Sequence, residues 1–203
     1  MFWIKFGILI TGFLYAGILP YTLRKALKCV EIDLSVDTLS MLSISELYGK
    51  KYRLGYTRLL FAAAILNYFF FGLLSEFYNL GDFAPFIKYI NYSGAFLAIL
   101  AFISHNIAPY RFEFLHKNIQ RILHNLFAVL VFLSLPTLIV LFEIARLPSC
   151  HFIAITGLVI IGIVAILTAW SILKNGVNGF SELLFINGIS IWSIFTTIVT
   201  ILR

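Results

Sequence analysis

Three histidines and one glutamate are the residues whose types could support chemistry. His105, His116 and His124 lie within one twenty-residue stretch, and Glu182 lies near the start of the last apolar segment. Imidazole and carboxylate groups bind zinc in proteins, and they also serve as general acids and bases. All four residues are therefore candidate metal ligands, and His124 and Glu182 are candidate catalytic residues.

The spacing of these residues leaves three interpretations open. His116 and His124 are eight residues apart, whereas the two histidines of an H-E-x-x-H zinc helix are four apart. A haem held between His105 and His124 is a second interpretation, since membrane cytochromes bind haem through histidines on different helices. The third is that these polar groups occupy helix ends in the hydrated headgroup region. We favour the third and expect no cofactor, with zinc or haem as the alternative.

Other catalytic signatures are missing from the sequence. It contains no G-x-S-x-G segment, and Cys29 and Cys150 form no C-x-x-C pair. Its glycines are scattered, as at Gly157 and Gly162, which suits close helix packing better than a phosphate-binding loop. We therefore do not expect an enzyme.

Six apolar runs must position these groups. The 203 residues are 61% hydrophobic and only 12% charged, whereas soluble domains average about a quarter charged. A helix of about 20 apolar residues crosses a bilayer. The composition predicts an all-α, polytopic membrane helical bundle, one domain over residues 1–203, with about six transmembrane helices at 2–21, 59–78, 91–108, 126–145, 152–173 and 183–202.

The basic residues predict the orientation of this bundle. Eleven of the fifteen lysines and arginines follow the first, third or fifth run. The positive-inside rule places those segments in the cytoplasm and both termini outside. The same rule accounts for the net charge of +6 without a nucleic-acid partner. A bacterial inner membrane and a eukaryotic endomembrane suit the sequence equally well.

The first connection, residues 22–58, is the one long polar segment. Residues 38–48 are expected to form a helix after Asp37, with Gly49 ending it. The apolar face of that helix precedes Lys50, Lys51 and Arg53, so we predict that it lies in the cytoplasmic interface and that these three residues contact lipid headgroups. The alternative is a short helix packed on the ends of the bundle.

Two segments resemble a known family. Leu115-His116 and the stretch from Ile122 to Phe127, which contains His124, open the fourth run, and Ser181-Glu182 opens the sixth. These segments resemble the six-span damage-regulated autophagy modulator family, its Sfk-like relatives and bacterial six-span proteins of unknown function. The resemblance implies that His124 and Glu182 are the matching positions and that the protein is associated with lipid. The basic first connection departs from the pattern of the family.

The function expected from the sequence is that of an integral membrane protein without a catalytic motif. We predict a lipid-associated module or a subunit of a membrane complex, with membrane lipids and other membrane proteins as partners. The alternative is a small membrane enzyme or redox protein that uses a His/Glu site at one end of the bundle.

Overall fold

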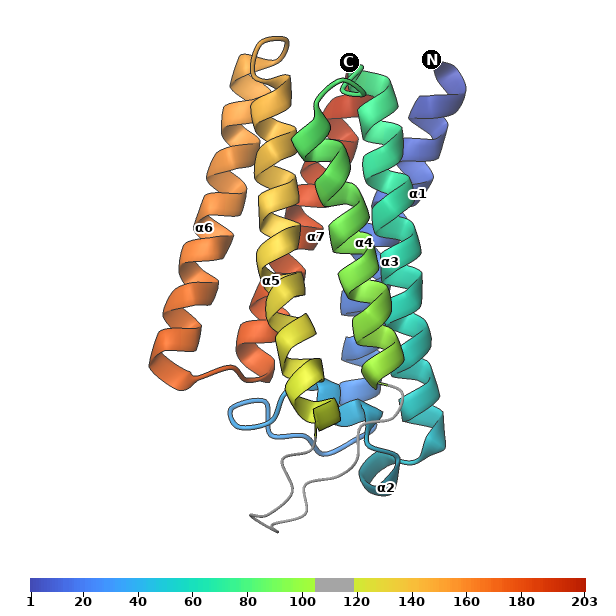
Figure 1. The fold of residues 1–203 in the computed structure, drawn as a ribbon, viewed down its shortest axis with the longest axis vertical. Helices are drawn as coiled ribbons and strands as arrows, with labels where there is room; N and C mark the ends of the chain where they lie inside the picture. The colour runs from blue at the N-terminus through green and yellow to red at the C-terminus, as the bar shows by residue number, and fades with distance from the viewer. Residues whose placement is uncertain (105–118) are drawn as a thin grey trace.

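The fold is a bundle of long helices, seen in a computed structural model that describes residues 1–104 and 119–203 (Figure 1). Six of the described helices are long and apolar enough to cross a membrane, which confirms the predicted all-α, multi-pass membrane fold. They are α1 (Phe2–Leu27), α3 (Lys50–Tyr78), α4 (Ala84–Ser104), α5 (Ile119–Arg146), α6 (His151–Asn175) and α7 (Gly179–Leu202). Two short elements, η1 (Leu39–Ser43) and α2 (Ser45–Tyr48), lie between α1 and α3.

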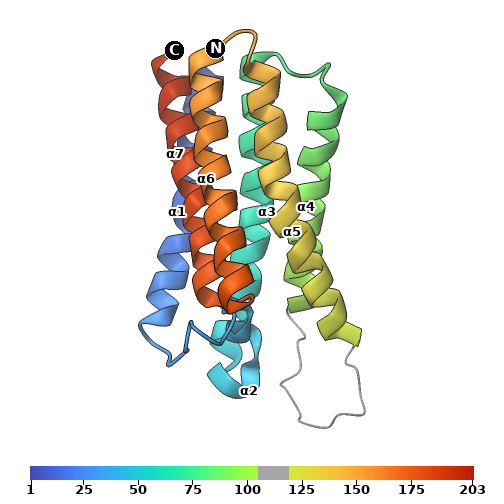
Figure 2. The same cartoon turned by 90° about the vertical axis from the view of Figure 1, so that its left-hand side faces the viewer.

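The long helices are arranged as a closed ring. Along the chain, α3 packs on α4, α4 on α5, α5 on α6 and α6 on α7, while α1 packs on both α7 and α3. Both termini lie at one end of the bundle, and η1 and α2 lie at the other (Figures 1 and 2). We call this second end the loop end. It also carries the turn between α6 and α7, so the first and fifth connections lie at the end opposite to the termini, as predicted. Residues 105–118 of the third connection lie outside the described residues.

Most of the helices are longer than the apolar runs that predicted them. Helix α1 continues to Leu27, past Arg24 and Lys25, and α3 begins at Lys50 rather than at residue 59. Hydropathy detects only the part of a helix that suits hydrocarbon, and polar turns extend beyond it. The connection predicted at 22–58 is therefore residues 28–49. Helix α4 begins seven residues before the predicted residue 91, and the predicted end of that run, 105–108, lies outside the described residues.

Aromatic side chains form the centre of the bundle. Trp192 of α7 stacks on Phe71 of α3 with ring centroids 5.6 Å apart, and both side chains are fully buried. Phe142 of α5 meets both rings edge to face. Each such pair adds about 0.5–1.5 kcal/mol to the stability of the fold, in addition to the stabilisation from burying its apolar surface. This cluster links three helices that are not consecutive in the ring.

Residues 38–48 do not form the predicted single helix. Ile44 has an extended backbone (φ −82°, ψ 101°) that separates the 3₁₀ turn η1 from the one-turn helix α2. Leu39 and Leu42 of η1 are buried against Leu23 of α1 and Leu59 of α3. The prediction of one continuous helix is therefore wrong, and η1 packs on the ends of α1 and α3. A location in the cytoplasmic interface stays a prediction. Gly49, with φ +86°, ends α2 as predicted.

Helix α7 begins with a capping box that the sequence analysis did not identify. The Asn178 side chain accepts from the Ser181 backbone N–H, and the Ser181 hydroxyl accepts from the Asn178 backbone N–H, both at 3.0 Å. We expect Asn178→Ala to lower the free energy of unfolding by about 1 kcal/mol, the usual cost of removing an N-cap. Thermal unfolding in detergent would measure it. The control is Asn175→Ala, at an exposed residue three positions earlier. Equal losses in the two variants would contradict the capping role.

Candidate functional site

The structure gives His124 and Glu182 separate partners. His124, in α5, is buried, and its Nδ1 lies 3.2 Å from the hydroxyl oxygen of Ser104 at the end of α4. Glu182, in the first turn of α7, accepts a 2.6 Å hydrogen bond from the backbone N–H of Leu39. Each side chain thus joins two neighbouring elements of the fold.

The predicted metal ligands are only partly described. His105 and His116 lie outside the described residues. Within residues 1–104 and 119–203, no three His, Cys, Asp or Glu side chains gather as a group that could hold a metal ion. The zinc and haem interpretations, which include His105 or His116, stay predictions.

Glu182 belongs to a set of bonds that fastens the first connection to α7. The backbone N–H groups of Gly179 and Phe180 donate to the carbonyls of Asp37 and Leu34, at 2.7 and 3.2 Å. The first N–H groups of a helix have no partner within the helix. The carbonyls of Leu34 and Asp37 supply two of those partners, and the bond from the Leu39 N–H to Glu182 holds η1 beside the start of α7.

The carboxylate of Asp33 stabilises the turn before these contacts. It accepts from the hydroxyl and from the backbone N–H of Ser35, at 2.6 and 2.9 Å. These two hydrogen bonds lower the pKa of Asp33 below its ordinary value, with the bond from the hydroxyl as the larger cause. The carboxylate therefore stays charged at neutral pH, and the turn is kept.

Glu143 and Arg146 form a buried ion pair at the end of the bundle that carries the termini. The guanidinium donates to both carboxylate oxygens of Glu143, at 2.5 and 2.8 Å, and neither side chain is exposed. The two residues are three positions apart in α5, which places them on the same face of the helix. The indole N–H of Trp192 donates to the same carboxylate at 2.7 Å, and Arg146 also reaches the Tyr78 hydroxyl at 3.4 Å. Sequence spacing did not reveal Trp192 and Tyr78, because they come from other helices.

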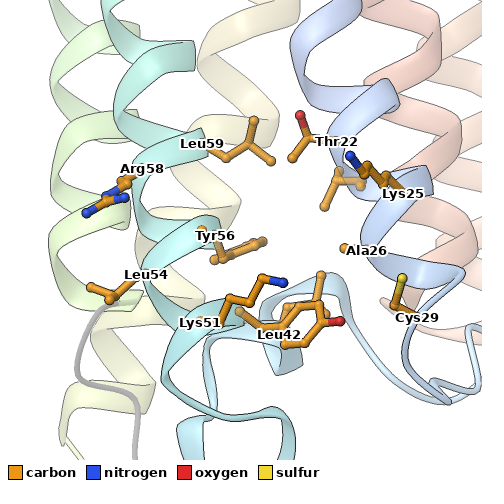
Figure 3. A pocket seen from close by; sticks show the side chains of 13 residues that line it. Thr22, Lys25, Ala26, Cys29, Leu42, Lys51, Leu54, Tyr56, Arg58 and Leu59 are labelled. Carbon is orange, nitrogen blue, oxygen red and sulfur yellow. The ribbon is translucent and has the colours of Figure 1, made fainter.

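A pocket of about 420 Å³ lies at the loop end, between α1, α3 and η1 (Figure 3). Its volume falls within the range of small-molecule sites, about 300–1,000 Å³. Buried Leu23, Leu42 and Leu59 form its inner wall, and exposed Lys25 and Lys51 belong to its outer edge. The residues that line it are Thr22, Leu23, Lys25, Ala26, Cys29, Leu42, Lys51, Tyr52, Leu54, Gly55, Tyr56, Arg58 and Leu59.

The charged side chains around the pocket differ in direction. Figure 3 shows Lys25 and Lys51 extending toward the space from opposite sides, while Arg58 points away from it. Of the three predicted headgroup residues, Lys51 therefore lines the pocket. Lys50 is exposed beside it, and Arg53 is half-buried in the same turn of α3. The sequence identified the charges but not the cavity, which is lined by residues from α1, η1 and α3 that are distant along the chain.

Comparison with known proteins finds no matching family model, no matching curated protein and no matching solved structure. The resemblance to the damage-regulated autophagy modulator and Sfk-like proteins stays a prediction. The chemistry of the loop end is argued below from the residues of this chain.

Proposed function

We propose that this integral, multi-pass membrane protein is a non-enzymatic module that gathers anionic lipids around its loop end. The observation that carries the proposal is the distribution of positive charge. In the described part of the chain, the lysines and arginines at or near the loop end are Arg24, Lys25, Lys28, Lys50, Lys51, Arg53, Arg58, Arg121 and Lys174. A cluster of cations directly beside membrane spans attracts anionic headgroups, at about 1 kcal/mol for each residue near the surface.

Two acidic residues of the first connection, Asp33 and Asp37, belong to the segment beside α7, whereas Glu46 lies in α2, directly before the basic start of α3. The segment that follows Asp33 is bonded to the start of α7, through Leu34 and Asp37. Lys50 and Lys51 instead begin α3, whose ring neighbours are α1 and α4. The start of α3 remains positive beside Glu46, because Lys50, Lys51, Arg53 and Arg58 lie in its first nine residues.

The contacts of His124 and Glu182 favour lipid association over His/Glu catalysis. A catalytic acid or base must reach the proton that it transfers. The carboxylate of Glu182 instead holds the backbone of Leu39, and His124 faces Ser104 between two packed helices. Both contacts suit residues that fasten the fold, which supports the proposal of a non-enzymatic module.

Lipid enrichment in nanodiscs tests the proposal. Discs assembled from a mixture of phosphatidylcholine and phosphatidylglycerol should be enriched in phosphatidylglycerol around the protein. Replacing Lys50, Lys51 and Arg53 with Gln should lower that enrichment clearly, because three of the nine cations are lost, all from one helical turn. Lipid extraction followed by mass spectrometry would measure it.

A charge-preserving variant provides the control. Lys50→Arg, Lys51→Arg and Arg53→Lys keep all three charges and should keep the enrichment. Raising the salt concentration should weaken it in the native protein, since exposed charges are screened. An unchanged lipid ratio in the triple Gln variant would overturn the proposal.

A further inference from the structure

We propose that the pocket between α1, α3 and η1 holds a single anionic phospholipid, with one acyl chain inside it and the phosphate between Lys25 and Lys51. This inference rests on the proposed lipid association, and it adds a stoichiometric site, a ligand class and the residues that select it. The general enrichment proposed above requires only a positive surface, whereas this site requires the cavity.

The inner wall of the pocket is suited to hydrocarbon. Leu23, Leu42 and Leu59 are 2–6% exposed and belong to one apolar cluster, so their packing fixes the shape of the wall. Leu54 and Ala26 add apolar surface nearer to the opening. Burying an acyl chain contributes about 0.8 kcal/mol for each methylene removed from water. An apolar space of this size beside the bilayer is therefore a binding site for a chain.

The outer edge is suited to a phosphate. Lys25 and Lys51 come from different helices and extend toward the same space (Figure 3). Among the described residues that line the pocket there is no Asp or Glu, so an anion there meets cations without a competing carboxylate. Lysine binds phosphate as a flexible point charge, and two lysines on opposite sides can hold one phosphate between them.

The depth of the pocket matches the headgroup layer. Lys25 lies in the last turn of α1, and Lys51 lies in the first turn of α3. Toward the middle of the bundle, α1 is mostly apolar on the far side of Arg24, and α3 is mostly apolar beyond Arg58, starting at Leu59. A phospholipid that enters from the adjacent leaflet would therefore place its phosphate at the lysines and its chain along Leu59 and Leu23. The phosphate of the lipid would thus meet the lysines of the pocket, and its acyl chain would meet the leucines.

Blocking the cavity tests the site without changing any charge. Gly55→Phe is the blocking variant, because Gly55 lines the pocket and a Cβ atom built on it meets nothing within 4 Å. Gly72→Phe is the matched control, because Gly72 lies on the same helix, is exposed, and has the same free space around a built Cβ. Protein from the mixed phosphatidylcholine and phosphatidylglycerol discs would be examined by native mass spectrometry in mild detergent.

We expect the native protein and Gly72→Phe to retain one phosphatidylglycerol, and Gly55→Phe to lose it. Lys25→Gln and Lys51→Gln should each weaken retention about fivefold, and together about 25-fold, from the usual contribution of a lysine at the membrane surface. The double variant Arg24→Gln and Lys28→Gln removes two charges from the same end of α1 at positions that do not line the pocket, so its retained lipid should be unchanged.

The outcomes separate this site from the general proposal. Loss of the retained lipid in Gly55→Phe, with bulk enrichment in the disc preserved, supports the site. Retention of phosphatidylglycerol by Gly55→Phe overturns the site while leaving the enrichment intact. Retention of phosphatidylcholine instead overturns the selection by Lys25 and Lys51. Absence of both the bound lipid and the enrichment in the native protein overturns the two proposals together.

Discussion

Glu143→Ala is expected to lower the free energy of unfolding by about 3–5 kcal/mol, the usual cost of removing one partner of a buried ion pair. The carboxylate accepts two hydrogen bonds from Arg146 and one from Trp192, and none of the three side chains is exposed. Without Glu143, a buried guanidinium keeps its charge and loses its main partner. Chemical or thermal unfolding of the purified protein in detergent would measure the loss.

The double variant Glu143→Leu and Arg146→Met is the control for this effect. Replacing both members of a buried ion pair by apolar residues of similar size is often neutral or stabilising. We therefore expect the double variant to be more stable than Glu143→Ala, although the Trp192 N–H loses its acceptor. If the double variant is as unstable as the single one, the loss comes from packing and not from the unpaired arginine.

The number and order of the spans followed from hydropathy because the bilayer imposes a fixed length on each apolar helix. The small polar residues within the spans could also be placed in advance. Asn67 and Ser93 are fully buried and bonded to each other at 2.9 Å, and Tyr15 donates to Asn67 at 3.1 Å. A polar group in a lipid environment must find a partner on a neighbouring helix. Burial inside the bundle was therefore predictable, but the identity of each partner was not.

The first connection was harder to predict because its structure depends on tertiary contacts. The apolar residues of 38–48 suggested one amphipathic helix, yet Leu39 and Leu42 are held by side chains of α1 and α3, and the Leu39 N–H is held by Glu182. Leu39 and Glu182 are 143 residues apart in the chain. Local periodicity does not contain that information. The pocket was missed for the same reason, although the lysines at its edge were visible in the sequence.

Gly157→Ala is expected to destabilise the protein, whereas Gly162→Ala, on the same helix, is not. Both glycines suggested close packing, but the structure separates them. A Cβ atom at Gly157 would collide with the carboxylate of Glu143, and a Cβ atom at Gly162 would meet nothing within 4 Å. Overpacking a buried position costs about 1–3 kcal/mol. Alanine in a helix is favoured over glycine by about 1 kcal/mol, so Gly162→Ala should be neutral or slightly stabilising.

The cost at Gly157 depends on Glu143 being unable to move. A free glutamate could turn away from a new methyl group, but Arg146 and Trp192 hold both of its oxygens on the α5–α6 interface. The loss from Gly157→Ala should therefore disappear in a Glu143→Ala background, because the atoms that the methyl group meets are gone. Unfolding of the two single variants and the double variant forms a thermodynamic cycle that measures this coupling. Additive losses would show that Gly157 matters for a reason other than the approach of α6 to the ion pair.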